Sequence, residues 1–228
     1  GSSTLVASKK FKDTLSGRKR NIHFTPVLIQ EMEAFGADLK KRFLHGGLPP
    51  ALLANRLDPD FYAEWLDSFY ARDIQELFAV EKRQPFLKAL EYLIAANGNQ
   101  FEITKLGQAS GVSRPTVAKY LDILEVTRAV SVIRPFSGNV EQEIVSQPKV
   151  YAFDSGFYCH VQNIKELRSE DCGLLLENLV LENIQATGFG NDVRYWRTKN
   201  KNEIDFVLPL ERGSVHAIEC KWKEKNFD

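Results

Sequence analysis

Residues 104–124 read TKLGQASGVSRPTVAKYLDIL, and this stretch has the pattern of a helix-turn-helix. Gly111 supplies the turn between two helices, Thr104 can cap the first helix, and Ser113 can cap the second. Pro115 is tolerated in the first turn of the second helix, because the backbone N–H groups there have no intrahelical partner. The apolar positions that we expect to face the core are Val117, Leu121 and Leu124.

The outer face of the second helix carries the residues that we expect to contact DNA. Arg114, Thr116 and Lys119 lie near its start, where helices of this kind meet the major groove. Two β-rich runs follow at residues 129–136 and 149–153, and they would complete a winged helix-turn-helix. Winged helices also serve as protein-protein modules, so this alternative stays open.

Residues 26–80 have helical periodicity. Pro26 is a plausible helix start, and apolar residues at three- and four-residue spacing lead to the basic run at residues 40–42, which would close the last turn. An aromatic stripe over residues 61–77 predicts a second helix that packs in a core. A third helix is expected at residues 86–94.

The C-terminal part predicts a helix followed by three strands. A strongly apolar helix is expected at residues 174–185, with Glu177 placed among its leucines. A carboxylate there either reaches the surface or is held for a purpose, because burying it unpaired is costly. Residue types that favour β structure predict strands at 193–198, 203–208 and 215–222, with turns at 200–202 and 211–213.

Carboxylates and a lysine would meet on these strands. Glu219 and Lys221 are two residues apart, so both point to the same face of the last strand. Pairing across the turn can bring Asp205 beside them. Asp205 and Glu219 could then hold a divalent cation such as Mg²⁺ through oxygen ligands. Glu177 could supply a third carboxylate. Such a group suits phosphodiester hydrolysis, whereas a strand Glu-x-Lys alone is usually solvated.

Six short motifs follow one another along the chain. They are DTLSGR at 13–18, GGLP at 46–49, GVSRPTV at 111–117, KVYAFDSG at 149–156, GLLLEN at 173–178 and EIDFV at 203–207. In this order they resemble the prokaryotic AAA-type ATPases that end in a domain of unknown function 4143. The resemblance runs over nearly the whole chain.

The resemblance implies a protein of three parts: an N-terminal P-loop ATPase, a winged helix, and a C-terminal domain similar to PD-(D/E)xK restriction endonucleases. It puts Asp205, Glu219 and Lys221 at the acid, acid and lysine positions of that motif. Glu177 would be the helical glutamate. Arg18 falls in a segment near the end of the ATPase core, where the resemblance implies that an arginine senses the nucleotide phosphate.

Together the patterns and the resemblance predict an α+β chain that ends in a small α/β restriction-endonuclease-like domain, truncated at its C-terminus. The expected divisions are a remnant of the ATPase core at 1–25, a helical segment at 26–82, a winged helix-turn-helix at 83–153 and the nuclease-like domain at 154–228.

The charges of the chain cancel but are unevenly spread, with 30 basic and 30 acidic side chains in total. Residues 81–138 hold eight basic and five acidic side chains, and residues 139–228 hold eleven basic and fifteen acidic ones. A basic segment beside an acidic one is compatible with DNA contact next to a carboxylate-rich site. No stretch reaches the roughly 18 apolar residues of a membrane helix, and no signal peptide is recognised, so we expect a cytoplasmic protein without membrane partners.

ATP is expected to bind outside these residues, because they contain no GxxxxGK[ST] phosphate loop. The single methionine is Met32, which predicts a piece of a longer protein whose ATPase domain is missing here. The sequence thus indicates the DNA-binding, nuclease-like region of an ATP-dependent protein. The alternative is a catalytically inert regulatory or protein-interaction module coupled to the ATPase. Whether DNA is cut, and whether the protein forms an oligomer, is left open.

Overall fold

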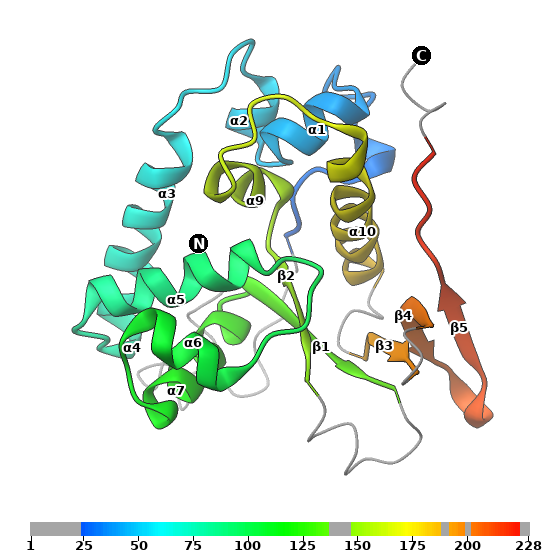
Figure 1. Ribbon diagram of the computed structural model, residues 1–228. Helices are drawn as coiled ribbons and strands as arrows, with labels where there is room; N and C mark the ends of the chain where they lie inside the picture. Colours follow the sequence, from blue (N-terminus) through cyan, green and yellow to red (C-terminus); the bar gives the residue numbers. More distant parts are fainter. Residues whose placement is uncertain (1–23, 137–146, 188–191, 199–201, 224–228) are drawn as a thin grey trace, which may run out of the picture.

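The computed structural model describes residues 24–136, 147–187, 192–198 and 202–223, and it shows a mixed α+β fold (Figure 1). A five-stranded sheet has the strand order β2-β1-β3-β4-β5. The pairing of β1 with β3 is parallel, and the other three pairings are antiparallel. The strands are β1 (Val130–Pro135), β2 (Lys149–Ala152), β3 (Arg194–Arg197), β4 (Glu203–Pro209) and β5 (Val215–Ile218). The predicted α+β class is confirmed.

Three helices, α5, α6 and α7, pack together next to β1 and β2 (Figure 1). They are α5 (Arg83–Ala95), α6 (Ile103–Ser110) and α7 (Arg114–Val126). Gly111 joins α6 to α7 with a backbone φ of 70°, in the left-handed region that glycine adopts readily. The predicted helices and their turn are therefore confirmed. Thr104 does not cap α6, because Glu102 is the residue before the first turn and Thr104 lies within the helix.

The N-terminal segment differs from the sequence prediction. The long helix predicted from Pro26 is wrong: only a 3-10 turn, η3 (Ile29–Glu31), forms there. Gly36 then adopts a φ of 60°, which interrupts any helix. Asp38 caps a new helix, α1 (Leu39–His45), by accepting a backbone N–H bond of 2.7 Å.

The remaining helical elements bring the aromatic stripe into the core. They are α2 (Pro49–Leu53), α3 (Phe61–Phe69), the π-helical turn η4 (Tyr70–Gln75), α4 (Glu76–Phe78), α9 (Ser155–Val161), α10 (Ser169–Ala186) and the 3-10 turn η5 (Glu211–Gly213). Phe69 and Ile74 are buried, and the ring of Trp65 stacks on that of Phe69 with centroids 5.3 Å apart. The predicted packing role of the stripe is confirmed.

Helix α10 covers β3 and β4 on one side, where Leu181 and Ile184 pack with Phe206 and Leu208 (Figure 1). A separate and larger cluster of apolar side chains joins α3 to α7 with β1, β2 and α9. Strands β1 and β2 therefore pack with α3 to α7 and α9, whereas β3 and β4 pack with α10.

The last strand is shorter than predicted. Strand β5 ends at Ile218 rather than at residue 222. The backbone N–H of Cys220 donates a 2.7 Å hydrogen bond to a carboxylate oxygen of Asp205, so a side chain replaces the next backbone acceptor of β4. Beyond this point the ring of Trp222 packs edge-on against Phe43 of α1, with centroids 5.8 Å apart. The chain therefore leaves the sheet and is held near α10 and α1.

Candidate functional site

The predicted carboxylates gather where β4 begins and β5 ends. Phe206 and Ile218 are the last paired residues of these strands, and continuing their register by one residue puts Asp205 beside Glu219. Burial raises the pKa of Asp205 and of Glu177 in α10; the charge of Glu219 adds to the rise at Asp205, and the charge of Asp205 adds to the rise at Glu177. The structure thus brings Glu177, Asp205 and Glu219 into electrostatic contact.

Glu177 is held on the inner side of this group. Burial, followed by the charge of Asp205, raises its pKa to about 7. The hydroxyl of Tyr151, on β2, donates a hydrogen bond of 3.0 Å to Glu177 Oε2. Glu177 is therefore a carboxylate that can change its protonation state near neutral pH, and its position is fixed by a strand that sequence reasoning did not connect with it.

Asp205 is buried at the start of β4. Burial raises its pKa, and the hydrogen bond from the backbone of Cys220 opposes this rise. Lys221, by contrast, is exposed, and its Nζ donates a 2.5 Å hydrogen bond to Glu219 Oε1. Both Glu219 and Lys221 lie beyond the end of β5, so the prediction that they belong to a strand is wrong.

Lys149 is a further charged residue of this region, and the sequence analysis did not identify it. It is the first residue of β2 and is 3% exposed. Its Nζ forms an ion pair with Glu203 of β4 and lies 5.5 Å from the centre of the Tyr195 ring. Its charge also opposes the rise that burial causes in the pKa of Glu177 and of Asp205. The signals that could have pointed to it are its place at the start of an apolar strand and at the start of the KVYAFDSG segment at 149–156.

Carboxylate oxygens are the donors that Mg²⁺ prefers, but their arrangement here does not complete a site for it. In the part of the chain that the structure describes, no group of three or more His, Cys, Asp and Glu side chains is placed to hold a metal ion. One oxygen of Asp205 already accepts the Cys220 N–H, and one oxygen of Glu219 accepts from Lys221. The residues as they stand do not fit the expected Mg²⁺ ion.

The predicted DNA-contacting residues lie at the start of α7. Arg114 and Lys119 are exposed, and Thr116 is half-buried. Ser113 occupies the N-cap position, but its hydroxyl pairs with that of Thr116 at 3.0 Å and makes no capping bond to the backbone. Val117 is fully buried on the opposite side of the helix. The helix thus presents two cations to solvent at the end where backbone N–H groups are free.

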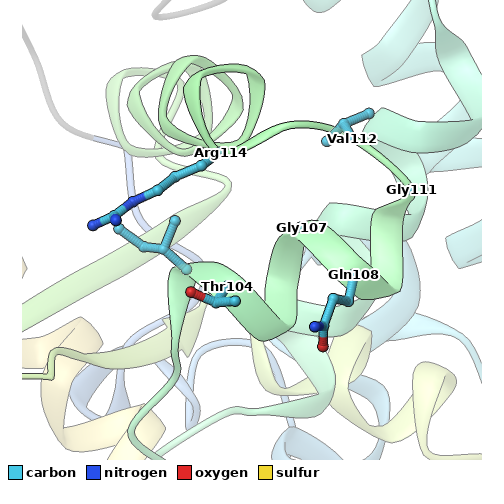
Figure 2. A pocket seen from close by; sticks show the side chains of 7 residues that line it. Thr104, Gly107, Gln108, Gly111, Val112 and Arg114 are labelled. Atoms are coloured by element: carbon cyan, nitrogen blue, oxygen red, sulfur yellow. The ribbon is translucent and has the colours of Figure 1, made fainter.

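An open pocket of about 400 Å³ lies between α6 and the start of α7 (Figure 2). In Figure 2 Arg114 of α7 and Thr104 of α6 lie on the side of the pocket away from Gly111. The residues that line the pocket are Ile103, Thr104, Gly107, Gln108, Gly111, Val112 and Arg114. Because no acidic side chain lines it, the pocket adds no counter-charge to Arg114.

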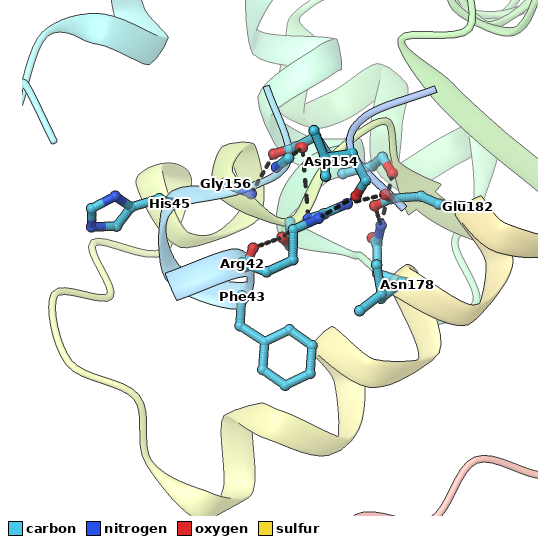
Figure 3. A network of polar contacts seen from close by, with 12 residues as sticks. Arg42, Phe43, His45, Asp154, Gly156, Asn178 and Glu182 are labelled. Carbon is cyan, nitrogen blue, oxygen red and sulfur yellow. Dashed lines mark hydrogen bonds and ion pairs between the residues drawn. The ribbon is translucent and has the colours of Figure 1, made fainter. Parts of the chain in front are cut away.

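Arg42 lies at the centre of a second charged group that the sequence analysis did not predict (Figure 3). It is 0% exposed, and its guanidinium forms ion pairs with Glu182 of α10 and, at 3.8 Å, with Asp154. It also donates to the Val27 carbonyl at 2.8 Å and to the Ser155 hydroxyl at 3.0 Å. Arg42 does lie in the last turn of a helix, α1, but its side chain is buried and joins three segments inside the protein.

The fold and the site define a mixed α+β protein in which a helix-rich part shares a sheet with a carboxylate-bearing C-terminal part. Two family profiles match these parts in order. The profile described as Domain of unknown function (DUF8612) matches residues 36–168, more than half of the chain, and Domain of unknown function (DUF4143) matches residues 172–227. The chain belongs to the DUF8612 family, and the second match confirms the C-terminal resemblance. Neither description names an ATPase or a nuclease.

Related proteins occur in bacteria and archaea. The chain is 26% identical over 217 residues to the uncharacterized protein Rv2008c of Mycobacterium tuberculosis and to the uncharacterized protein Mb2031c of Mycobacterium bovis, which covers 92% of this chain and 48% of each relative. It is 24% identical over 251 aligned residues to the uncharacterized protein MJ1544 of Methanocaldococcus jannaschii. This alignment covers 99% of this chain and 55% of that relative. The chain thus spans about half the length of the curated relatives it matches. No solved structure matches it.

Two further predictions concern Arg18 and the membrane. Arg18, expected to sense a nucleotide in the parent protein, lies outside the described residues. Among the helices of the described ranges, none is both long and apolar enough to cross a membrane.

Proposed function

We propose that this chain is the DNA-binding, nuclease-like C-terminal region of an ATP-dependent protein of the AAA family. The observation that carries the proposal is the arrangement around α7. Three packed helices followed by the antiparallel strands β1 and β2 have the order of a winged helix, and α7 has the position of a recognition helix. Contact with phosphates or with guanine requires cationic side chains, and α7 supplies the exposed Arg114 and Lys119.

The size and polarity of α7 support DNA as the partner. An α-helix fits the major groove, and the first turn of α7, apart from Pro115, leaves backbone N–H groups without an intrahelical partner near the two cations. Asp122 is the first exposed acidic residue of the helix, about one turn beyond Lys119. The start of α7 is therefore the end of the helix that would enter the groove, and Thr116 lies between the two cations.

A direct test compares the affinity of variants for duplex DNA by fluorescence anisotropy. The double variant Arg114→Ala, Lys119→Ala is expected to bind about 10- to 100-fold more weakly. The control Lys82→Ala, Lys88→Ala removes two positive charges from exposed positions at or before α5 and should stay within about twofold of the wild type. Equal affinity of the α7 variant and the wild type would assign α7 to a protein contact instead.

The second candidate function is phosphodiester hydrolysis by the C-terminal carboxylates. The observation that favours it is that the β4–β5 register puts Asp205 beside Glu219, while the charge of Asp205 acts on Glu177 of α10. In this proposal Asp205 and Glu219 form the acidic pair, Lys221 offsets charge on the phosphate, and Glu177 is the additional carboxylate. The test is cleavage of DNA by the full-length protein, measured both with and without Mg²⁺ or Mn²⁺. Cleavage that Asp205→Asn abolishes supports the proposal, and its absence in the wild type leaves an inert module coupled to the ATPase.

The coupling to ATP concerns the longer parent protein. The relatives are about twice as long as this chain, which leaves room for an ATPase domain. We infer that Arg18 senses the nucleotide there. ATP hydrolysis by the full-length protein should fall in Arg18→Ala, while the fragment alone should hydrolyse no ATP. ATPase activity that is unchanged in this variant would remove Arg18 from that role.

A further inference from the structure

One buried cation lies among four carboxylates at the junction of β2, β4 and α10. Glu203 and Asp205 belong to β4, Glu219 lies beside Asp205 when the β4–β5 register is continued, and Glu177 of α10 accepts a hydrogen bond from Tyr151 of β2. Glu203 forms ion pairs with Lys149 and, at 3.3 Å, with the exposed Arg197, and Glu219 pairs with the exposed Lys221. Lys149 is thus the buried cation of the group, whereas the other two cations lie at the surface.

The position of the Lys149 ammonium is fixed from several sides. The side chain is 4% exposed, its Nζ pairs with Glu203, and it lies over the ring of Tyr195. The Tyr195 hydroxyl is itself held, because it accepts from Gln100 at 2.6 Å and donates to the Gln147 carbonyl at 2.6 Å. The Lys149 ammonium is therefore held inside the protein, whereas the ammonium of a surface lysine extends into solvent.

We propose that the Lys149 ammonium is the resident cation of this carboxylate group and takes the electrostatic place that a divalent metal would have. A metal ion entering here would meet a buried positive charge and compete with it for Glu203. It would also have to displace the Cys220 N–H from Asp205 and Lys221 from Glu219. A site that already contains its cation has little affinity for another one.

The cation and the carboxylates come from different family segments. Lys149 and Tyr151 belong to β2, within the stretch matched by DUF8612, whereas Glu177, Glu203 and Asp205 belong to the stretch matched by DUF4143. The charge balance therefore depends on the contact of the two segments. This inference concerns the carboxylate group alone, so it stands or falls separately from DNA contact by α7.

The test measures Mn²⁺ binding by isothermal titration calorimetry and by the thermal midpoint Tm. Wild-type protein is expected to show no Mn²⁺ binding below about 1 mM and no rise in Tm. Lys149→Met removes the charge and keeps the length of the side chain. This variant should bind Mn²⁺, with a Tm rise of about 3–6 °C when the ion is at tenfold its dissociation constant.

Two matched variants serve as controls. Lys149→Arg keeps the charge, so it should behave like the wild type. The double variant Lys149→Met, Glu203→Gln removes both charges of the ion pair and should lose most of the gained Mn²⁺ affinity. If Lys149→Met alone unfolds, Mn²⁺ should restore its folding as followed by circular dichroism, because the ion replaces the missing charge.

Two results would overturn the proposal. The first is wild-type Mn²⁺ binding tighter than about 100 µM that Asp205→Asn abolishes, since this measurement does not depend on any Lys149 variant. The second is a Lys149→Met protein that gains neither Mn²⁺ affinity nor Mn²⁺-dependent folding. DNA affinity is measured on the same wild-type sample and tests only the contact of α7 with DNA. A failure of that proposal can therefore be told apart from a failure of the proposal for Lys149.

Discussion

Arg42 and Glu182 form an ion pair inside the protein, although 140 residues separate them in the chain. Arg42 lies in α1 and Glu182 in α10, so the pair joins the segment matched by one family profile to the segment matched by the other. Asn178 donates to the second oxygen of Glu182 at 2.8 Å. The buried guanidinium thus links the two parts through hydrogen bonds that fix their relative position.

Removing the guanidinium should strongly destabilise the protein. Arg42→Met leaves Glu182 and Asp154 buried without their counter-charge, which is expected to lower the free energy of unfolding by about 3–5 kcal/mol. Urea unfolding followed by circular dichroism measures this. Arg83→Met breaks the exposed pair with Asp67 and is the matched control, with an expected loss below about 1 kcal/mol. Similar losses in the two variants would show that the buried pair has no special role.

Gly46 should tolerate no side chain, because it lies against the same charged group. Its φ is 74°, and a Cβ there would stand 1.9 Å from Asp154 Oδ1. Gly46→Ala is therefore expected to lower the free energy of unfolding by about 3–5 kcal/mol. Gly111→Ala has a similar φ of 70° and open space around it, so only the backbone strain of about 1–2 kcal/mol applies. Thermal or urea unfolding measures both variants. Equal losses of unfolding free energy in Gly46→Ala and Gly111→Ala would contradict the tight packing at Gly46.

Glu177 should make stability fall as the pH rises. Its pKa is raised from 4.5 to about 7 in the folded protein, so folding favours the protonated form. This contribution is fully present below pH 4.5 and is lost between pH 4.5 and about 7, where only the unfolded chain has released the proton. Urea unfolding at pH 5 and pH 7.5 should show a drop in the wild type that is about 1–3 kcal/mol larger than in Glu177→Gln. An identical drop in the free energy of unfolding of the wild type and of Glu177→Gln would show that the titration of another group causes it.

The salt dependence of DNA binding should report the number of phosphate contacts made by α7. Each lost phosphate contact reduces the slope of log affinity against log salt concentration by about one. The slope of the Arg114→Ala, Lys119→Ala variant should therefore be about two units shallower if both side chains contact phosphate. A variant that is weaker at every salt concentration but has the wild-type slope would indicate that the cations contact bases instead.

The helices and strands that follow a strong local pattern could be predicted from the sequence. The turn at Gly111, the buried face of α7 and the strands β1 to β4 depend on residue spacing within one element, and this spacing survives in the fold. The helix expected from Pro26 failed because Gly36 and Asp38 outweigh the apolar spacing around them. Local signals thus succeed where no capping or glycine signal competes with them.

Charged residues buried by distant partners could not be predicted in the same way. Arg42 and Lys149 are ordinary basic residues in the sequence, and their burial depends on Glu182, Asp154 and Glu203, which lie far along the chain. The end of β5 depends likewise on a side chain of the neighbouring strand, which accepts the Cys220 N–H. The carboxylates were found because their motif assigns them a role, whereas Lys149 opens the quoted KVYAFDSG segment, which by itself assigns no role to this lysine.

The central claim is that the start of α7 enters a DNA groove, and site-specific photo-crosslinking tests it most directly. A photoreactive amino acid at Thr116, between Arg114 and Lys119, should form a covalent adduct with duplex DNA on irradiation, whereas the same amino acid at Lys88 of α5 should form little or none. Adducts at Lys88 in preference to Thr116, or no adduct at Thr116 in a sample that binds DNA, would contradict the claim.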